Sequence, residues 1–257
     1  MKKKILFYIT LIVLTLIFII SAQKIINWYL EGKHTNELLD EINKKIEIID
    51  GNEQSIVTGN ATDDIKKNLV SIDVNKLKKL NNDVVGYIKV NNTSISYPVV
   101  QTINNDYYLT HSFDKSNNSA GWVFMDYQNN SNDFDNNTII YAHGRLDNTM
   151  FGSLKKVIKK EWFTNVDNYV IDFSTEYYDS LWQVFSVYKI KTTNDYLKIY
   201  FDSNYKYENF INMITERSIY EFPTKVDIDD KILTLSSCYN DSEKVVLHAK
   251  LIKYNRK

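Results

Sequence analysis

The N-terminus carries an uncharged apolar stretch that is long enough to leave the aqueous phase. Three lysines, Lys2, Lys3 and Lys4, precede residues 5–22 (ILFYITLIVLTLIFIISA), which contain no charged side chain. As a helix rising about 1.5 Å per residue, this stretch is roughly 27 Å long and can cross the hydrocarbon core of a bilayer. The lysines predict a cytoplasmic tail at residues 1–4 and an extracellular location for everything after residue 22.

A cleaved signal peptide has a similar pattern of lysines followed by apolar residues. The apolar part of such a peptide is usually shorter, roughly 7 to 15 residues, and Ser21, Ala22 and Gln23 make a poor cleavage site. We therefore favour an uncleaved, single-pass signal anchor in the cell membrane, with cleavage as the alternative.

The composition excludes several classes of protein. The chain has 31 Lys and Arg against 32 Asp and Glu, a formal net charge of -1, so no nucleic-acid partner is expected. Its 7 glycines and 2 prolines exclude collagen-like and linker-like chains. The single cysteine, Cys238, excludes an intrachain disulfide and a cysteine-based zinc cluster. An unpaired thiol outside the cell is open to oxidation, which favours a catalytic role for Cys238.

The chain beyond the apolar stretch divides into a membrane-proximal part, 23–74, and a domain of catalytic size, 75–257. Apolar residues at helical spacing over 24–49, interrupted by Gly32, predict two short helices. Gly, Asn, Asp and Thr over 50–63 predict a linker, and a polar helix is expected over about 65–80.

The domain itself has the pattern of a mainly β protein. From Val84 onward, short β-branched and aromatic runs alternate with Asn, Asp and Ser clusters. Strands are expected at 84–90, 94–100, 121–126, 137–142, 168–173, 181–191, 231–236 and 244–252. Eight strands in ~170 residues predict a closed barrel or a sandwich. Two helical insertions are expected, at 150–160 and 205–217.

Cys238 follows an apolar run at the end of a predicted strand. A thiol in this position is held rigidly and can face a groove, as a nucleophile must. The alternative is a buried structural thiol, which the polar neighbours Ser236, Ser237 and Asn240 make less favourable.

Cysteine catalysis also requires an imidazole that moves protons, and the chain has four histidines. His34 belongs to the membrane-proximal part and is expected to be solvated, and His111 is expected in a loop. His248 lies inside the strand after Cys238, with its orientation undetermined. His143 closes a predicted strand, as Cys238 does, and we choose it as the acid–base partner.

These segments resemble the sortases, membrane-anchored cysteine transpeptidases of Gram-positive bacteria, and class B most closely. Segment 233–238 (LTLSSC) is similar to the sortase T-L-x-T-C signature, with serine where threonine is usual. Segments 141–143 (YAH) and 150–156 (MFGSLKK) are similar to the class B Y-G-H segment and the M-F-x-x-L-K-K helix. Further blocks in the family's order extend the resemblance over roughly residues 75–253; they lie at 83–88, 97–101, 105–109 and 120–127.

The resemblance implies an eight-stranded sortase-type β-barrel with N-terminal helices and a helix inserted before the cysteine strand. It implies that the Cys238 thiolate attacks a threonine carbonyl in the C-terminal sorting motif of a secreted protein and forms a thioester acyl-enzyme. His143 would protonate the leaving amine and deprotonate an incoming amine of the peptidoglycan stem or cross-bridge. This chemistry requires no cofactor and no metal.

One catalytic position departs from the family pattern. Sortases carry an arginine on the strand after the cysteine, and here Lys244 precedes segment 245–251 (VVLHAKL). Lysine keeps the positive charge but lacks the planar fork that binds an oxyanion with defined geometry. Lys244 is our candidate for this role; the alternatives are Arg145 or Arg217 folding into the site, or a weakly active enzyme with a solvated lysine.

The resemblance also predicts part of the peptide-binding groove, which would be lined by Asn105, Leu109, Tyr141 and Ser236. Two other functions remain open at this point. One is a pilus-polymerising sortase, which joins pilin to pilin, and the other is a non-catalytic surface binding module that kept the barrel.

Overall fold

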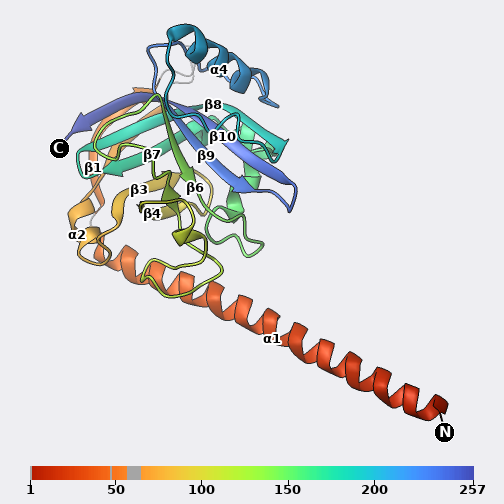
Figure 1. Ribbon diagram of the computed structural model, residues 1–257. Helices are drawn as coiled ribbons and strands as arrows, with labels where there is room; N and C mark the ends of the chain where they lie inside the picture. Colours follow the sequence, from red (N-terminus) through yellow and green to blue (C-terminus); the bar gives the residue numbers. More distant parts are fainter. Residues whose placement is uncertain (1, 47, 57–64) are drawn as a thin grey trace.

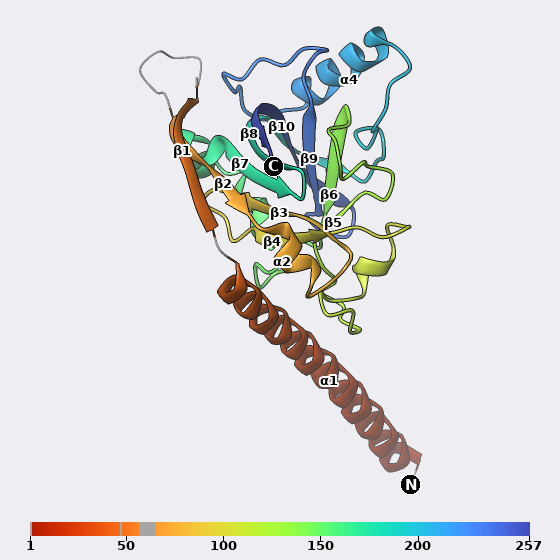
Figure 2. The same ribbon diagram turned by 90° about the vertical axis from the view of Figure 1, so that its left-hand side faces the viewer.

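The computed structural model describes residues 2–46, 48–56 and 65–257. A long N-terminal helix projects from one end of a closed β-barrel, as Figures 1 and 2 show from two sides. Within the described residues, α1 is the helix that is long and apolar enough to cross a membrane, and its most apolar window is 0% buried.

Helix α1 (Lys2–Lys45) is continuous, so the prediction of two short helices separated at Gly32 is wrong. A glycine inside a helix costs only about 1 kcal/mol relative to alanine, too little to break a helix that is held from outside. Gly32 is buried against the barrel domain, where an added Cβ would lie 2.7 Å from Asp147 Oδ2. The glycine therefore marks a close approach between the helix and the domain.

The expected eight-stranded barrel is confirmed. Going around the barrel, the order is β10-β8-β7-β3-β4-β5-β6-β9. The strands are β3 (Val84–Val90), β4 (Ser96–Val100), β5 (Phe124–Met125), β6 (Asn137–Tyr141), β7 (Val170–Thr175), β8 (Tyr178–Lys191), β9 (Ile232–Cys238) and β10 (Glu243–Arg256). The pairs β4–β5 and β6–β9 are parallel, and the other neighbours are antiparallel.

The segment between α1 and the barrel differs from the sequence prediction. β1 (Ile48–Ile56) and β2 (Ile65–Ile72) form a two-stranded antiparallel sheet, so the linker at 50–56 and the helix at 65–72 are wrong; residues 57–64 of the predicted linker lie outside the described residues. β2 lies against the barrel, where Ser174 Oγ donates to Val70 O at 3.0 Å. This tertiary contact overrides a local sequence with weak strand preference. Helix α2 (Val74–Lys78) is what remains of the predicted helix, capped by Asp73.

Both expected helical insertions are present. The first consists of the 3₁₀ turn η2 (Gly152–Lys156) and the short helix α3 (Lys160–Phe163), and two further 3₁₀ turns are η1 (Tyr107–Leu109) and η3 (Val166–Tyr169). The second is α4 (Asn204–Glu216), which begins where Ser203 Oγ accepts from Lys206 N. Its apolar face, Tyr207, Phe210, Ile211 and Ile214, packs on barrel residues that include Phe185, Ile232 and Val246.

Two strand pairings bring distant segments to one edge of the barrel. β6 and β9 run parallel with Tyr141 opposite Ser236, so their C-terminal ends lie side by side. β9 and β10 run antiparallel with Cys238 opposite Lys244. The residues that follow β6 and those that connect β9 to β10 therefore meet at this edge.

Candidate active site

Cys238 is the last residue of β9, and the barrel register places Lys244 beside it. Lys244 Nζ lies 3.0 Å from Cys238 Sγ, and both residues are half-buried. The connecting turn is fixed by Asn240, whose Oδ1 accepts from the backbone N–H groups of Ser242 and Glu243, each at 2.9 Å. The register thus holds an ammonium group within hydrogen-bonding distance of the thiol sulfur.

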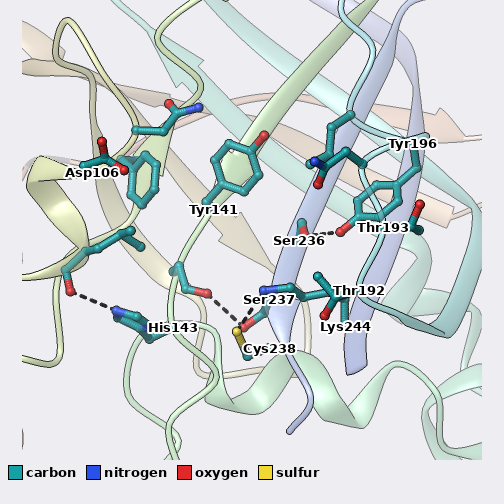
Figure 3. Close-up of a pocket in the computed structure, with 16 residues that line it drawn as sticks. Asp106, Tyr141, His143, Thr192, Thr193, Tyr196, Ser236, Ser237, Cys238 and Lys244 are labelled. Carbon is teal, nitrogen blue, oxygen red and sulfur yellow. Dashed lines mark hydrogen bonds between the residues drawn. The ribbon is translucent and has the colours of Figure 1, made fainter. Parts of the chain in front are cut away.

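His143 follows β6 and lines the same groove as Cys238 and Lys244 (Figure 3). Its Nε2 lies 2.8 Å from Leu109 O. Because a carbonyl oxygen only accepts hydrogen bonds, Nε2 carries a proton and Nδ1 is the ring nitrogen left for proton exchange. The structure thus brings together Cys238, His143 and Lys244, the three residues predicted for catalysis.

The segments that carry His143 and Cys238 are packed backbone to backbone. A Cβ built on Gly144 would overlap the carbonyl oxygen of Cys238, so only glycine fits there. Ser237, which stands where the sortase signature has threonine, donates from Oγ to Ala142 O at 2.9 Å. Sequence reasoning did not find these contacts, although a glycine directly after a candidate histidine is a usable signal of close approach.

A groove of about 340 Å³ extends from Cys238 along the barrel edge. The four residues predicted to bind peptide, Asn105, Leu109, Tyr141 and Ser236, all line it. Asp126, which sequence reasoning missed, organises two of them, because its Oδ2 accepts from Asn105 Nδ2 and from Tyr141 OH, both at 2.9 Å. Burial and then the Asp126 carboxylate raise the pKa of Tyr141, which keeps its hydroxyl protonated as a donor.

The opposite wall of the groove comes from the segment after β8, which includes Thr192, Thr193, Asn194, Tyr196 and Leu197. Tyr196 OH and Ser236 Oγ are 2.9 Å apart, and burial raises the pKa of Tyr196 despite this hydrogen bond. The sequence analysis did not predict this wall. The signal that could have indicated it is a cluster of polar residues directly after a long strand, because binding residues are often found on such loops.

A second hollow, of about 700 Å³, lies on another side of the same two catalytic candidates. It is lined by Cys238 and His143 together with Arg145, the Tyr239–Asp241 turn and Trp28 of α1. The reactive groups can therefore be approached from two hollows.

The other candidates for charge and proton transfer are engaged elsewhere. Arg145 Nη2 donates to Asp147 Oδ2 at 3.0 Å, and Arg217 forms a two-pronged pair with Asp195 at 2.9 and 2.6 Å. Lys244 is the basic side chain beside the thiol, while Arg145 and Arg217 bind carboxylates.

The remaining histidines have structural partners. His248 is buried between Tyr188 OH and Thr234 Oγ1, at 2.9 and 2.8 Å, and burial lowers its pKa to about 3. His111 is half-buried and stacks on Tyr107. His34 is partly exposed to solvent, as expected, and its Nε2 lies 3.1 Å from Asp114 Oδ2. Across the described residues, no group of three or more His, Cys, Asp or Glu side chains is placed to hold a metal ion.

The sortase family profile matches residues 88–252, which hold most of the eight-stranded barrel together with His143, Cys238 and Lys244. Sortase B of Staphylococcus aureus is 33% identical over 150 residues, which are 57% of this chain and 61% of that protein. Sortase B of Listeria monocytogenes is 30% identical over 150 residues, which are 57% of this chain and 60% of the Listeria protein. The matched part thus spans less than two thirds of these relatives.

Solved structures agree with the sequence comparison. A Staphylococcus aureus sortase B–substrate complex has a TM-score of 0.66 and 34% identity, covering 70% of this chain and 84% of that one. Bacillus anthracis sortase B in complex with AAEK1 has a TM-score of 0.71 and 31% identity, covering 89% and 99%. The chain belongs to the sortase family, and its similarity is to class B.

Proposed function

We propose that this protein is a cysteine transpeptidase that cleaves a C-terminal sorting motif of secreted proteins and joins them to an amine of the peptidoglycan stem or cross-bridge. The observation that carries the proposal is the 3.0 Å contact between Lys244 Nζ and Cys238 Sγ, at the head of a groove that His143 also lines. The similarity to a sortase B–substrate complex supports a peptide as the occupant of this groove.

In the first half-reaction, Cys238 Sγ attacks the carbonyl carbon of the scissile peptide bond while the Lys244 ammonium stabilises charge on sulfur and then on the carbonyl oxygen. His143 Nδ1 holds the proton that the Cys238 thiol gave up, and it passes this proton to the leaving amine as the C–N bond breaks. The products are a thioester on Cys238 and the released C-terminal peptide.

In the second half-reaction, an acceptor amine attacks the thioester carbon. His143 takes a proton from this amine, the C–S bond breaks, and the Cys238 thiolate is restored beside Lys244. Because Nε2 of His143 is held by Leu109 O, the ring keeps one orientation through both proton transfers.

We also propose that residues 5–22 anchor the protein in the membrane, with residues 1–4 in the cytoplasm and the domain at 75–257 outside. The continuous α1, whose apolar window is 0% buried, supports this arrangement.

The proposal is tested by incubating the protein with a panel of sorting peptides and an amine acceptor, and by identifying the products by mass spectrometry. We expect cleavage before the final part of the motif and a new amide bond to the acceptor. Cys238→Ala and His143→Ala should each abolish both products while the melting temperature stays near that of the wild type. Full activity in either variant would exclude that residue from catalysis.

The same experiment separates the other functions. A thiol-reactive sorting-peptide analogue should label Cys238 in the wild type; binding without labelling would point to a non-catalytic module. Preference for a pilin lysine over peptidoglycan amines as acceptor would point to a pilus-polymerising enzyme.

A further inference from the structure

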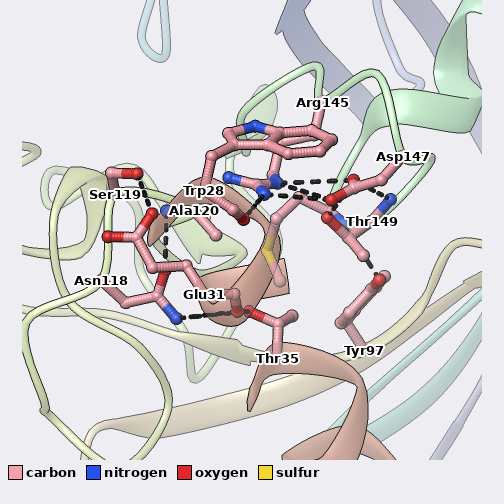
Figure 4. A network of polar contacts seen from close by, with 11 residues as sticks. Trp28, Glu31, Thr35, Tyr97, Asn118, Ser119, Ala120, Arg145, Asp147 and Thr149 are labelled. Atoms are coloured by element: carbon pink, nitrogen blue, oxygen red, sulfur yellow. Dashed lines mark hydrogen bonds and ion pairs between the residues drawn. The ribbon is translucent and has the colours of Figure 1, made fainter. Parts of the chain in front are cut away.

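Helix α1 contacts the barrel domain over its C-terminal part, where Ile42 is buried in the core and Tyr87 OH donates to Asn43 Oδ1. The first part of this contact, residues 28–35, is here called the docking segment. Figure 4 shows this segment between two loops that come from different parts of the domain. One is the histidine loop, residues 143–149, and the other is the asparagine loop, residues 117–121.

The docking segment holds the histidine loop through Arg145, which is 8% exposed. The Arg145 guanidinium lies 4.9 Å from the ring centroid of Trp28, and its Nη2 donates to Trp28 O at 3.1 Å. Asp147 pairs with the same guanidinium, and its Oδ1 accepts from Thr149 N and Thr149 Oγ1 at 3.0 and 2.6 Å. Burial acts to raise the pKa of Asp147, but the hydrogen bonds from Arg145 and Thr149 outweigh it and the pKa lies below its usual value.

The docking segment holds the asparagine loop through Asn118, which is 3% exposed. Asn118 Nδ2 donates to Glu31 O at 3.3 Å and lies 3.4 Å from the buried Thr35 Oγ1. Ser119 Oγ donates to the Glu31 carboxylate. Asn118 also shapes its own loop, because its Oδ1 accepts from Ala120 N at 2.8 Å.

Both loops lie next to His143: the histidine loop begins with it, and the asparagine loop contacts it in space. Gly144, the neighbour of His143 in the histidine loop, is packed on the Cys238 carbonyl. Gly121, at the end of the asparagine loop, has a positive φ of 61° and lies so close that an added Cβ would be 3.1 Å from His143 Cδ2 and 3.0 Å from Leu109 O. Leu109 O is the acceptor that fixes His143 Nε2. The docking segment thus supports His143 from both of its flanks.

We propose that the docking segment positions His143, with Trp28 and Gly32 as positioning residues for the transpeptidation of the preceding section, on which this inference rests. Gly32 allows the approach, since any side chain there would displace the Asp147 carboxylate that holds Arg145. His143 is the one residue of the two loops that lines the peptide groove; the other lining residues come from β5, β6, β9, β10, Ala142 and the segments near residues 105–109 and 192–197. Disturbing the docking segment should therefore impair proton transfer and leave peptide binding nearly unchanged.

The test uses the full chain in detergent micelles with one accepted peptide. Trp28→Ala and Gly32→Leu should each lower kcat at least tenfold with KM within about twofold, and Trp28→Phe, which keeps an aromatic face for Arg145, should recover most of the loss. Leucine and alanine favour a helix more than glycine does, so a loss in Gly32→Leu cannot come from weaker helix formation. The matched control is Tyr29→Ala: Tyr29 lies within the docking segment, but its side chain is 63% exposed, so this variant should stay within twofold of the wild type.

A second readout is independent of activity. In protein labelled with ¹³C at histidine, the His143 signal is assigned with His143→Gln. It should shift in Gly32→Leu and Gly32→Ala, more in the former, and stay in place in Tyr29→Ala. Unchanged kcat and an unchanged His143 signal in Gly32→Leu, with a wild-type melting temperature, would overturn the inference. A wild-type protein that cleaves no peptide would contradict the proposed function alone, because the His143 signal would still report on docking.

Discussion

Lys244 reaches Cys238 through the strand register, since the two residues are opposite partners in the β9–β10 pair. Its ammonium is therefore held at the thiol by the barrel itself. A lysine can supply charge to an oxyanion, but it lacks the flat pair of donors that a guanidinium would offer.

Removing this charge should slow the reaction more than it weakens binding. Lys244→Ala should lower kcat on the order of a hundredfold to a thousandfold, the usual loss for one oxyanion donor. Lys244→Arg should retain or raise kcat, because the planar fork returns. The measurement is steady-state kinetics on one peptide. Arg145→Ala and Arg217→Ala serve as comparisons, and a near-wild-type rate for Lys244→Ala would remove Lys244 from the mechanism.

His248 gives the protein a stability that depends on pH. In the unfolded chain its pKa is near the ordinary value of 6.5, and in the folded protein burial lowers the pKa to about 3. The unfolded state therefore binds the proton first, so stability is complete above about pH 6.5 and falls as the pH decreases toward 3. Lowering the pH from about 7 to about 5 should reduce the free energy of unfolding by roughly 2 kcal/mol through this residue.

Urea unfolding at these two pH values measures the effect. In His248→Gln, the loss of unfolding free energy on acidification should be smaller by that amount. An equal loss in both proteins would show that other groups cause the acid sensitivity.

At the residue level, the resemblance of sequence segments to the sortases located side chains of the types that peptide binding requires. The four groove residues were found in this way, whereas Cys238 and His143 were found from their places at the ends of predicted strands; the groove contains all six. Asp126 and Tyr196 were missed because their importance lies in hydrogen bonds to Tyr141 and Ser236, partners that only the closed barrel brings within 2.9 Å.

Among the elements, the parallel pair β6–β9 has the largest part in building the site. It places the segments after Tyr141 and before Cys238 at one edge, where Gly144 is packed on the Cys238 carbonyl. Gly144→Ala should therefore force the two strand ends apart. We expect a loss of activity of at least a hundredfold and a destabilisation of about 1–3 kcal/mol, as for overpacked interiors.

Activity and urea unfolding of Gly144→Ala measure the two effects together. Ser203→Ala, which removes the cap of the distant helix α4, is the control that should lose about 1 kcal/mol of stability and keep its activity. A fully active Gly144→Ala would show that this packing does not set the site geometry.

The strands of the barrel were predictable because alternating β-branched and aromatic residues are a local signal, and β3 occupies the very range expected for it. The errors have a different origin. β1 and β2 are polar segments that become strands through pairing with each other, and Gly32 stays helical because the barrel domain holds the helix there. Such tertiary contacts leave no mark in the periodicity of a segment.

For the whole molecule, the proposed anchor predicts a definite location. The protein should be recovered in the membrane fraction, with its C-terminal domain digested by protease added to intact protoplasts. Replacing residues 5–22 with a cleavable signal peptide provides the control that should appear in the medium. A soluble wild-type protein trimmed at its N-terminus would indicate cleavage instead.

Because α1 is continuous, it also fixes the distance between the proposed membrane anchor and the part of the helix that lies beside the active site. Trp28, which lines the hollow beside Cys238, lies six residues beyond the end of the proposed anchor on the same uninterrupted helix. At about 1.5 Å per residue, Trp28 lies roughly 9 Å along the helix from the end of the proposed anchor, with no break in the helix between them. Under the proposed anchor and function, the rigid helix keeps Cys238 near the bilayer, so that the peptide bonds within its reach are those that lie close to the membrane.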